Sequence, residues 1–571
     1  MNKTTLSLIG LIIFLSIGYV AFQRNDNGDT VSTVEAEYFA HEVSDDVPLA
    51  RTSEVVELSD GDSYEMVAGI VRQEVGNRSV KRLAYNGQIP GPLLKVDQNS
   101  TITLTLTNNL DVPTTLHPHG LRLDNQFDGV PDVTQPPIEV GESFTYELTF
   151  PDEGIYWYHP HIREDYTQEL GLYGNFLVDP TDENYWNEVD RKEFIILDDF
   201  LEGEKFKTDV VTHTLMGRFG DTMLINDQDN YMLEVTQGES ARLYITNVAN
   251  TRTFDFAIPN VQMKLVGGDV GRIEKDTLID SQIIAPAERY VVEVLFEEVG
   301  TFPIEHRGER VGEIIVREGV APSVDKKTTF NTLRTHDHSY EDVRADFDAY
   351  LAQSPDKTLR LDIEMGDELH TTMMGNMDHE SMMVKEEGEN MMMNMQMDDD
   401  AMREHCEVMP EMAGCEQYTD ESMKMEHGGM MMQEHGSEDG IEWEDDMGMM
   451  NQMSNDENIT WRLIDEDTGK ENMDIDWRFR QGDMIKVRIF NDPSTMHPMQ
   501  HPIHFHGQRF VVLSKDGVAN NNLQWKDTVL VPQGKTIDIL VEMSNPGTWM
   551  AHCHIAEHLH AGMMLSFDVA K

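Results

Sequence analysis

The sequence predicts an all-β protein made of Greek-key β-sandwich domains. Short runs in which apolar and polar residues alternate recur along the chain, as in residues 100–106 and 143–150. This period of two is typical of strands with one buried face. Asn86-Gly87 and the Pro90–Pro92 run mark turns between such segments. With 571 residues and a hydrophobic content of 39%, the chain can form about four domains, or fewer if the β-domains are large.

The N-terminal segment favours export. A start with one lysine is followed by an apolar run from Leu6 to Phe22. Residues 1–24 are therefore interpreted as a signal peptide or as an uncleaved membrane anchor, because a run of this length lies at the lower edge of a membrane span. The expected location is the periplasm or cell envelope. Residues 25–54 are acidic and turn-rich, and are predicted to be a flexible tether.

The charge of the chain excludes some partners. It has 104 acidic and 44 basic residues, a formal net charge of −60. This argues against binding to nucleic acid or to an anionic membrane surface, and it favours cations nearby. The alternative explanation is the soluble acidic surface of a salt-adapted protein.

Three sandwich domains are expected, over residues 55–182, 190–318 and 356–571. The second contains the strand-like runs 241–247 and 289–296 but no His-x-His pair, so it is predicted to be a structural spacer. A charged linker, residues 319–355, is expected between the second and third domains.

A methionine-rich insert, residues 373–453, interrupts the third domain and holds 22 of the 37 methionines. Its mixture of Met, Asp, Glu and Gly predicts a mostly disordered segment rather than a core helix. Soft thioethers select Cu(I), so we expect the insert to recruit additional Cu(I). Its other soft or borderline ligands are His379, His405, Cys406, Cys415, His427 and His435. An inert insert is the alternative, and Cys406 and Cys415 could instead pair.

Histidines form the main chemical signal. Four His-x-His pairs carry this signal: His117 with His119, His159 with His161, His504 with His506, and His552 with His554. On a strand, both rings of such a pair point to one face. Eight imidazoles are more than one ion takes, and imidazole suits copper, so the pairs predict a copper cluster rather than a zinc site or structural histidines.

Cys553 lies between His552 and His554 and should point to the opposite face. His558 and Met563 follow it, and His501 precedes the last-but-one pair by three residues. Two imidazoles, one thiolate and a weak axial thioether are the ligands of a blue-copper electron-transfer site. His501 and His558 are the expected exits for electrons to the surface.

These four motifs resemble those of the multicopper oxidases, the laccase-like family, over most of residues 55–571. The resemblance implies three cupredoxin domains, with a cluster shared between the first and the last. It also implies about four coppers, which take electrons from a reductant and reduce O2 to water. The implied type 1 ligands are His501, Cys553, His558 and Met563; the type 2 ligands are His117 and His504; the type 3 ligands are His119, His159, His161, His506, His552 and His554.

Acidic residues are needed to supply protons. By the same resemblance Asp128, nine residues after His119, matches an acid that such enzymes place near the cluster. Relatives often carry another acid directly after the type 1 histidine, where this chain has Leu559. Glu557 is the nearest carboxylate in sequence and is the candidate for that role.

The methionine-rich insert resembles that of bacterial copper-efflux and copper-resistance oxidases, so Cu(I) is the expected substrate. The protein is expected to be a monomer. Those enzymes build a substrate site from two methionines and two acids, at positions that match Met365, His370, His497 and Met499. Both acids are histidines in this chain, and Asp367 and Met496 lie close by in sequence. The alternatives are a laccase-like phenol oxidase or a ferroxidase, and, in another class, a copper-sequestering protein.

Overall fold

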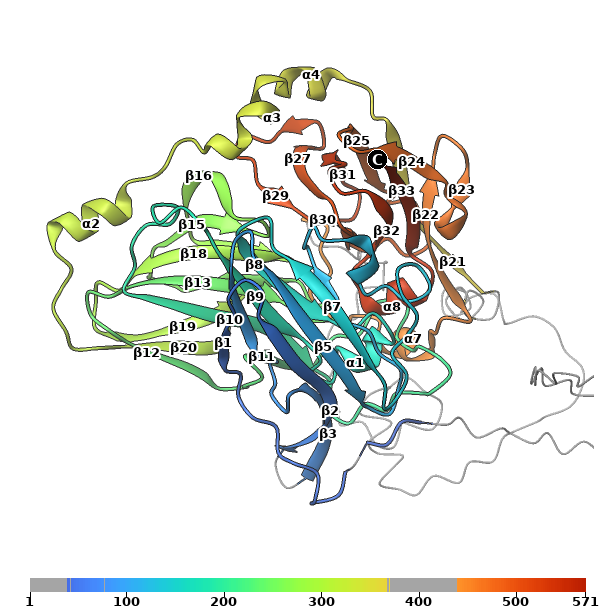
Figure 1. Cartoon of the computed structure of the whole chain (residues 1–571), viewed down its shortest axis with the longest axis horizontal. Coiled ribbons are helices and arrows are strands. Elements are labelled where there is room, and N and C mark those ends of the chain that lie inside the picture. The colour runs from blue at the N-terminus through green and yellow to red at the C-terminus, as the bar shows by residue number, and fades with distance from the viewer. Residues whose placement is uncertain (1–37, 42, 76–77, 367–368, 370–438) are drawn as a thin grey trace, which may run out of the picture. The chain divides into compact units, whose positions relative to one another are not determined.

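The computed structural model describes residues 38–41, 43–75, 78–366, 369 and 439–571. Strands dominate these residues and form pairs of sheets that pack face to face (Figure 1). The predicted all-β class is therefore confirmed.

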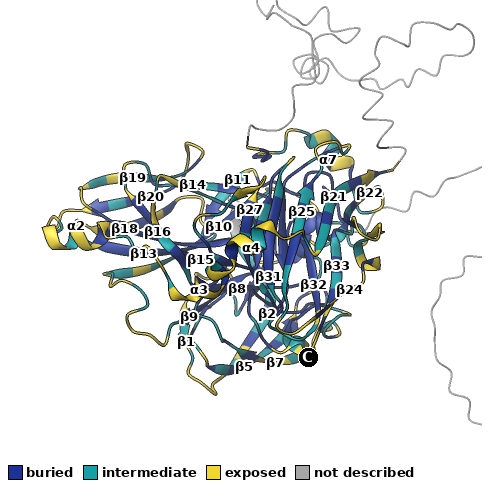
Figure 2. Cartoon of the chain, turned by 90° about the horizontal axis from the view of Figure 1, so that it is seen from above, coloured by how far each residue is buried: buried dark blue, intermediate teal, exposed yellow. Residues whose placement is uncertain are grey.

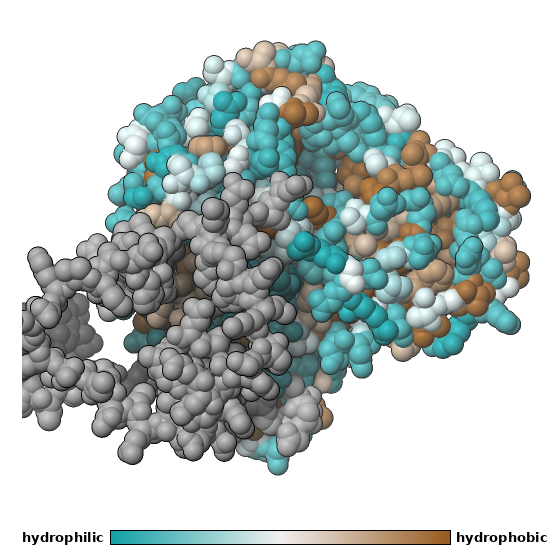
Figure 3. All heavy atoms as spheres, turned by 180° about the vertical axis from the view of Figure 1, so that it is seen from behind, coloured by the Kyte–Doolittle hydropathy of each residue, from teal (hydrophilic) through white to brown (hydrophobic). Residues whose placement is uncertain are grey.

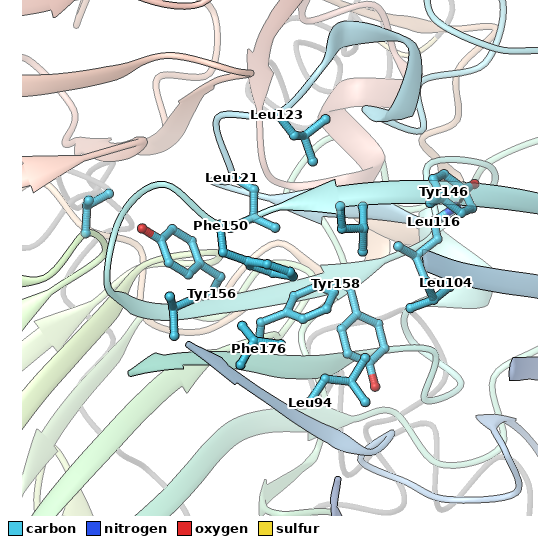
Figure 4. Close-up of a cluster of buried hydrophobic side chains, with 14 of the residues drawn as sticks. Leu94, Leu104, Leu116, Leu121, Leu123, Tyr146, Phe150, Tyr156, Tyr158 and Phe176 are labelled. Atoms are coloured by element: carbon cyan, nitrogen blue, oxygen red, sulfur yellow. Dashed lines mark hydrogen bonds between the residues drawn. The ribbon is translucent and has the colours of Figure 1, made fainter. Parts of the chain in front are cut away.

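The first domain is a sandwich of two sheets, with strand orders β1-β4-β9-β8-β6 and β3-β2-β5-β7. Its core lies between them, where alternate side chains of β5, Ile102, Leu104 and Leu106, are buried among aromatic rings (Figure 4). The period-two pattern of residues 100–106 therefore marks a strand with one buried face. The strands are β1 (Val55–Glu57), β2 (Ser63–Val75), β3 (Arg78–Tyr85), β4 (Leu93–Asp97), β5 (Thr101–Asn109), β6 (His117–His119), β7 (Ser143–Thr149), β8 (Gly154–His159) and β9 (Gly174–Asp179).

The second domain pairs a sheet of order β11-β10-β13-β18-β15-β16 with one of order β12-β20-β19-β14-β17. A separate apolar core fills the space between these sheets. The strands are β10 (Arg191–Phe200), β11 (Thr222–Ile225), β12 (Tyr231–Thr236), β13 (Ser240–Asn247), β14 (Phe254–Ala257), β15 (Met263–Gly268), β16 (Arg272–Ile279), β17 (Ser281–Ile284), β18 (Arg289–Leu295), β19 (Gly300–His306) and β20 (Glu309–Arg317).

The third domain pairs a sheet of order β23-β22-β21-β25-β31-β27-β28, to which β29 adds beside β27, with one of order β24-β33-β32-β26-β30. Its core includes Leu215, Met216 and Phe219 of the second domain, so these two domains share packing. The strands are β21 (Lys357–Met365), β22 (Ile459–Asp465), β23 (Lys470–Glu471), β24 (Trp477–Arg480), β25 (Met484–Asn491), β26 (His501–Phe505), β27 (Arg509–Lys515), β28 (Val518–Ala519), β29 (Trp525–Lys526), β30 (Thr528–Val531), β31 (Thr536–Glu542), β32 (Gly547–Cys553) and β33 (Met564–Ala570).

Short helices connect the sheets. They are α1 (Glu164–Thr167), α2 (Val324–Asn331), α3 (Glu341–Ala345), α4 (Phe347–Ala352), α7 (Gly448–Met453) and α8 (Ala556–His560), with the 3-10 turns η1 (Asn125–Phe127), η2 (His338–Tyr340) and η4 (Asn472–Asp474). Helices α2, α3 and α4 belong to the predicted linker and lie on the outside (Figure 2). Tyr340, Val343 and Phe347 are nevertheless buried in an apolar cluster that also contains residues of the first and third domains, so this part of the linker is packed into the fold.

The N-terminal part of the described chain differs from the predicted flexible tether. Phe39 stacks on Tyr166 with the ring centroids 4.2 Å apart, and its N–H donates to Phe206 at 3.0 Å. Ala50 and Arg51 make backbone hydrogen bonds to Arg72 and Gly87. Residues 38–41 and 43–54, the part of the tether that the structure describes, therefore lie against the first two domains.

The end of the predicted insert is also folded. Ile441 and Trp443 are buried, and Asn451 accepts a hydrogen bond from the Met216 N–H and donates one to the Gly217 carbonyl. Residues 439–453, at the end of an insert expected to be mostly disordered, are therefore folded and pack on the second domain. Residues 373–438 lie outside the described residues.

Hydrophilic side chains cover much of the face seen in Figure 3, as the large negative charge leads one to expect. Within the described residues, no helix is long and apolar enough to cross a membrane; residues 1–24, interpreted as a signal or an anchor, are not among them.

Candidate metal centres

Strand pairing brings the four His-x-His pairs together. β6 runs antiparallel to β8, which sets His117 opposite His159, and β26 runs antiparallel to β32, which sets His504 opposite His552. The first and third domains then place their histidines face to face, with the rings of His119 and His504 stacked at 3.8 Å. All eight rings are buried, the most exposed being His161 at 6%.

The eight histidines fall into three groups that could each hold an ion. Within each group one ligand atom per residue lies within 4.8 Å of the others. Both domains contribute to every group, so the centre exists only where the two domains meet. The groups are His117, His119 and His504; His119, His159 and His554; and His161, His506 and His552.

Hydrogen bonds to the outer ring nitrogens fix the orientation of these histidines. The Nδ1 atoms of His117, His159 and His504 donate to backbone carbonyl oxygens at 2.7, 2.8 and 2.9 Å. A carbonyl partner holds Nδ1 in its protonated form and leaves Nε2 with a lone pair. His119 is reversed: its Nε2 lies 3.0 Å from Asp527 Oδ1, so Nδ1 faces inward.

The inward nitrogens provide a test of whether metal ions fit here. Six of them are buried and have no hydrogen-bond partner: Nε2 of His117, His159, His161, His504 and His554, and Nδ1 of His119. The Nε2 atoms of His506 and His552 face each other at 3.0 Å. Buried polar atoms without partners are rare and costly.

Burial and the neighbouring imidazoles also hold the pKa of such rings, His159 and His554 among them, well below the usual value, so they are neutral ligands. The residues fit copper ions.

A second centre surrounds Cys553. Its Sγ lies 3.6 Å from His501 Nδ1 and 3.8 Å from His558 Nδ1, and those two nitrogens are 3.3 Å apart. The Cys553 N–H donates to the Met563 carbonyl at 3.0 Å, which sets the buried Met563 beside it. Burial raises the pKa of the Cys553 thiol, so a bound cation must displace its proton.

The histidines of this second centre, the expected exits for electrons, are covered. His501 is 1% exposed and His558 is fully buried. The Trp461 ring packs on both, at 4.8 and 4.3 Å between centroids, and its Nε1 donates to the Thr214 carbonyl at 2.7 Å. A loop of the second domain thus helps to cover the centre.

The two predicted acids occupy different positions. Asp128 lies between the two domains' histidines, with Oδ2 2.9 Å from His506 Nδ1 and Oδ1 3.4 Å from His117 Nδ1. Glu557 is buried beside the second domain, where it contacts Arg218 at 3.4 Å and accepts from Thr251 at 3.5 Å. Burial, partly offset by Arg218, raises the pKa of Glu557 to about 7.

Sequence reasoning missed one acid that touches the centre. Glu164 lies 2.9 Å from His161 Nδ1 through Oε1 and 2.7 Å from His560 Nε2 through Oε2. It therefore connects a histidine of the first domain to helix α8 of the third. The only signal for it in the sequence was its position three residues after His161.

A further acid, Asp527, was also missed. It faces His119 at 3.0 Å, and Arg289 of the second domain binds both its oxygens, at 2.7 and 2.5 Å. Although burial acts to raise it, Arg289 and His119 hold the pKa of Asp527 well below its usual range. Its partners are more than 200 residues away in sequence, so no local pattern could indicate it.

The candidate substrate residues are only partly brought together. Met365 and Met499 are buried in the same apolar cluster as Cys553, whereas Met496 is 46% exposed. The ring of His497 lies 6.5 Å from that of Trp461. Asp367 and His370 lie outside the described residues.

Comparison with known proteins identifies the class. Multicopper oxidase family models match residues 70–183, 192–338 and 441–571. The chain therefore belongs to the multicopper oxidase family, whose members are copper-dependent oxidoreductases with oxygen as the acceptor.

Several relatives cover most of the chain. An oxidoreductase of Pestalotiopsis microspora is 27% identical over 90% of this chain and 84% of its own length. The multicopper oxidase MmcO of Mycobacterium tuberculosis is 25% identical over 87% and 85%. Copper resistance protein A of Pseudomonas syringae pv. tomato is 25% identical over 48% and 53%. The solved structure of the McoA multicopper oxidase of Aquifex aeolicus has the same fold, with a TM-score of 0.62 and 19% identity over 92% of this chain and all of that one.

Proposed function

We propose that this multicopper oxidase is a cuprous oxidase. It oxidises four Cu(I) ions to Cu(II) while one O2 and four protons form two water molecules. Resident copper supplies one-electron chemistry at the Cys553 centre and oxygen reduction at the histidine centre. We assign about four coppers: one type 1 at His501, Cys553, His558 and Met563, one type 2 at His117 and His504, and a type 3 pair at His119, His159, His161, His506, His552 and His554.

The chain itself connects the two centres. Cys553 is covalently adjacent to both His552 and His554, so the ligands of the electron-accepting centre and of the oxygen-reducing centre share one stretch of backbone. Asp128 orients His506 and Glu164 orients His161. Asp128 and Glu557 remain our candidates for handling protons.

Burial of the type 1 histidines is the observation that carries the proposal. Because His501 and His558 are at most 1% exposed, a phenol ring cannot stack directly on either imidazole. A single ion needs less room and can give up its electron through the indole of Trp461, which packs on both rings and lies next to His497. This geometry favours a small reductant over a bulky one.

Methionines supply the preference for Cu(I), because thioethers select that ion. Met365 and Met499 are buried in the apolar cluster that contains Cys553. Met447 and Met450, from the folded end of the insert, are partly buried against that cluster. The exposed Met496 leads outward. We propose that Cu(I) passes along these residues, with His497, Asp367 and His370 as further ligands, and that the insert adds Cu(I) by recruitment. Export of the protein, supported by the apolar run of residues 6–22, would place this activity in the cell envelope.

Oxygen uptake with Cu(I), Fe(II) and a phenol, measured in parallel on the copper-loaded protein, tests the substrate. We expect the highest kcat/KM with Cu(I). A higher value with Fe(II) or the phenol would replace the proposal with a ferroxidase or a laccase, and no uptake with any reductant would leave a copper-sequestering protein.

The double variant Met365→Leu/Met499→Leu tests the route. It should raise the KM for Cu(I) about tenfold or more and leave phenol turnover and the blue absorption unchanged, since Met and Leu have similar volumes. Met543→Leu is the matched control, because Met543 is fully buried in the same cluster. Equal Cu(I) kinetics in the double variant and the control would remove the substrate site from this position.

A further inference from the structure

Another His-x-His pair lies far in sequence from the copper centres. His336 and His338 belong to the docked linker between the second and third domains. Their side chains are 46% and 88% exposed, and among the histidines in the described ranges these are the two in the exposed class. The oxidase mechanism uses neither of them.

One carboxylate oxygen brings the two rings together. Glu341 Oε1 lies 3.3 Å from His336 Nε2 and 2.5 Å from His338 Nδ1. The ring centroids are 5.4 Å apart and the planes are nearly perpendicular, at 84°. Two ring nitrogens and one oxygen thus converge on one point at the surface.

The backbone beneath this point is held in place. The Tyr340 hydroxyl, which is buried, donates to the Arg272 carbonyl at 2.5 Å and accepts from the Trp525 N–H at 3.2 Å. Asp337 accepts from the Ser339 N–H and hydroxyl through one oxygen. Its other oxygen faces Arg272 at 3.8 Å, so Asp337 supports the turn and is not a fourth ligand.

An ion pair explains the contact only in part. Glu341 raises the pKa of His338 through their hydrogen bond, and such exposed pairs contribute little to stability. A helical i, i+3 ion pair with Glu341 would require only His338. His336 also directs its Nε2 to the same Glu341 oxygen. Two imidazoles with a carboxylate form a borderline ligand set, for which Cu(II) has the highest affinity among the common divalent ions.

We propose that His336, His338 and Glu341 form an exchangeable Cu(II) site on the surface, with solvent in the remaining positions. The chain's net charge of −60 raises the local concentration of cations. The site does not depend on the proposed substrate, although Cu(II) is the ion that oxidation of Cu(I) would release beside the protein.

Protection from diethylpyrocarbonate, read residue by residue by mass spectrometry, tests the site on the copper-loaded full chain. Both exposed histidines should be modified readily in the absence of added metal. Added Cu(II) should slow modification of His336 and His338 together, and Zn(II) at the same concentration should protect less. Unchanged modification with Cu(II), or stronger protection by Zn(II), would overturn the assignment.

Variants separate coordination from a general charge effect. Glu341→Gln should raise the Cu(II) concentration needed for half protection by about tenfold or more. Loss of a group that only hydrogen-bonds to a metal ligand already lowers metal affinity by about that factor, and loss of a ligand should lower it at least as much. Asp342→Asn, the exposed neighbouring acid, removes the same charge and should leave protection unchanged. An equal effect of the two substitutions would mean that the cation is only attracted, not ligated. Because the readout is modification and not turnover, it holds whatever the oxidase substrate is.

Discussion

The Cys553 centre and the histidine centre are built in different ways. All side chains of the first, His501, Cys553, His558 and Met563, come from the third domain, and pairing of β26 with β32 together with helix α8 brings them into contact. The second takes four histidines from the first domain and four from the third. One centre depends on strand register within a domain, the other on how two domains dock.

This difference explains where the supporting contacts lie. Around the histidine centre they cross domain boundaries: Asp128 to His506, Glu164 to His560, and Arg289 to Asp527. The last contact comes from the second domain, which was expected to be a mere spacer. Variants of these contacts should therefore harm the histidine centre and spare the Cys553 centre.

The largest effect is expected from Cys553→Ser, which breaks the local centre alone. The variant should lose the blue absorption and all oxidase activity, since every electron enters through the thiolate ligand, and it should keep the other coppers. Copper analysis, visible absorption and oxygen uptake measure this. A colourless wild-type protein with a full copper load would refute the assignment.

Asp527→Asn should break the shared centre instead. Loss of the carboxylate that orients His119 is expected to lower activity by about 10- to 100-fold and to weaken copper binding there, with the blue absorption intact. Arg289→Met should also destabilise the fold by about 3–5 kcal/mol, because it leaves Asp527 as an unpaired buried charge.

Copper content, the electron paramagnetic resonance signal of the type 2 ion and chemical denaturation check these two variants. Exposed Glu147→Gln on β7 is a control for loss of a carboxylate elsewhere in the first domain. If Asp527→Asn bleached the blue colour as strongly as it lowered activity, the two centres would not be separable.

A smaller effect is expected from Glu164→Gln. Glutamine keeps the shape but not the charge, so His161 should lose part of its orientation, and we expect activity to fall by about tenfold. The near-ultraviolet absorption of the type 3 pair should change while the blue band stays. His560→Gln, which removes only the link to α8, should have a weaker effect; the reverse order would place the function of Glu164 in domain docking rather than in orienting His161.

The smallest effect on the centres is expected from deletion of residues 373–438. The blue colour and phenol oxidation should remain, and Cu(I) oxidation should fall only when copper is scarce, because recruitment is lost. Extending the deletion to residue 453 removes the buried Trp443 and Asn451 and should lower the melting temperature, which calorimetry measures. Loss of both activities in the shorter deletion would mean that the removed segment is needed for the fold.

The sequence by itself determined the all-β class, the ligand types and their pairing, because strand periodicity and His-x-His spacing are local. Only the tertiary structure decided that His501 and His558 are covered, that residues 439–453 are folded, and that Glu164, Asp527 and Arg289 support the histidine centre. These features depend on contacts between residues far apart in the chain: Trp461 against Thr214, Asn451 against Met216, Arg289 against Asp527. Local periodicity predicts which face of a strand is buried, but it does not predict which residues of another domain pack against that face.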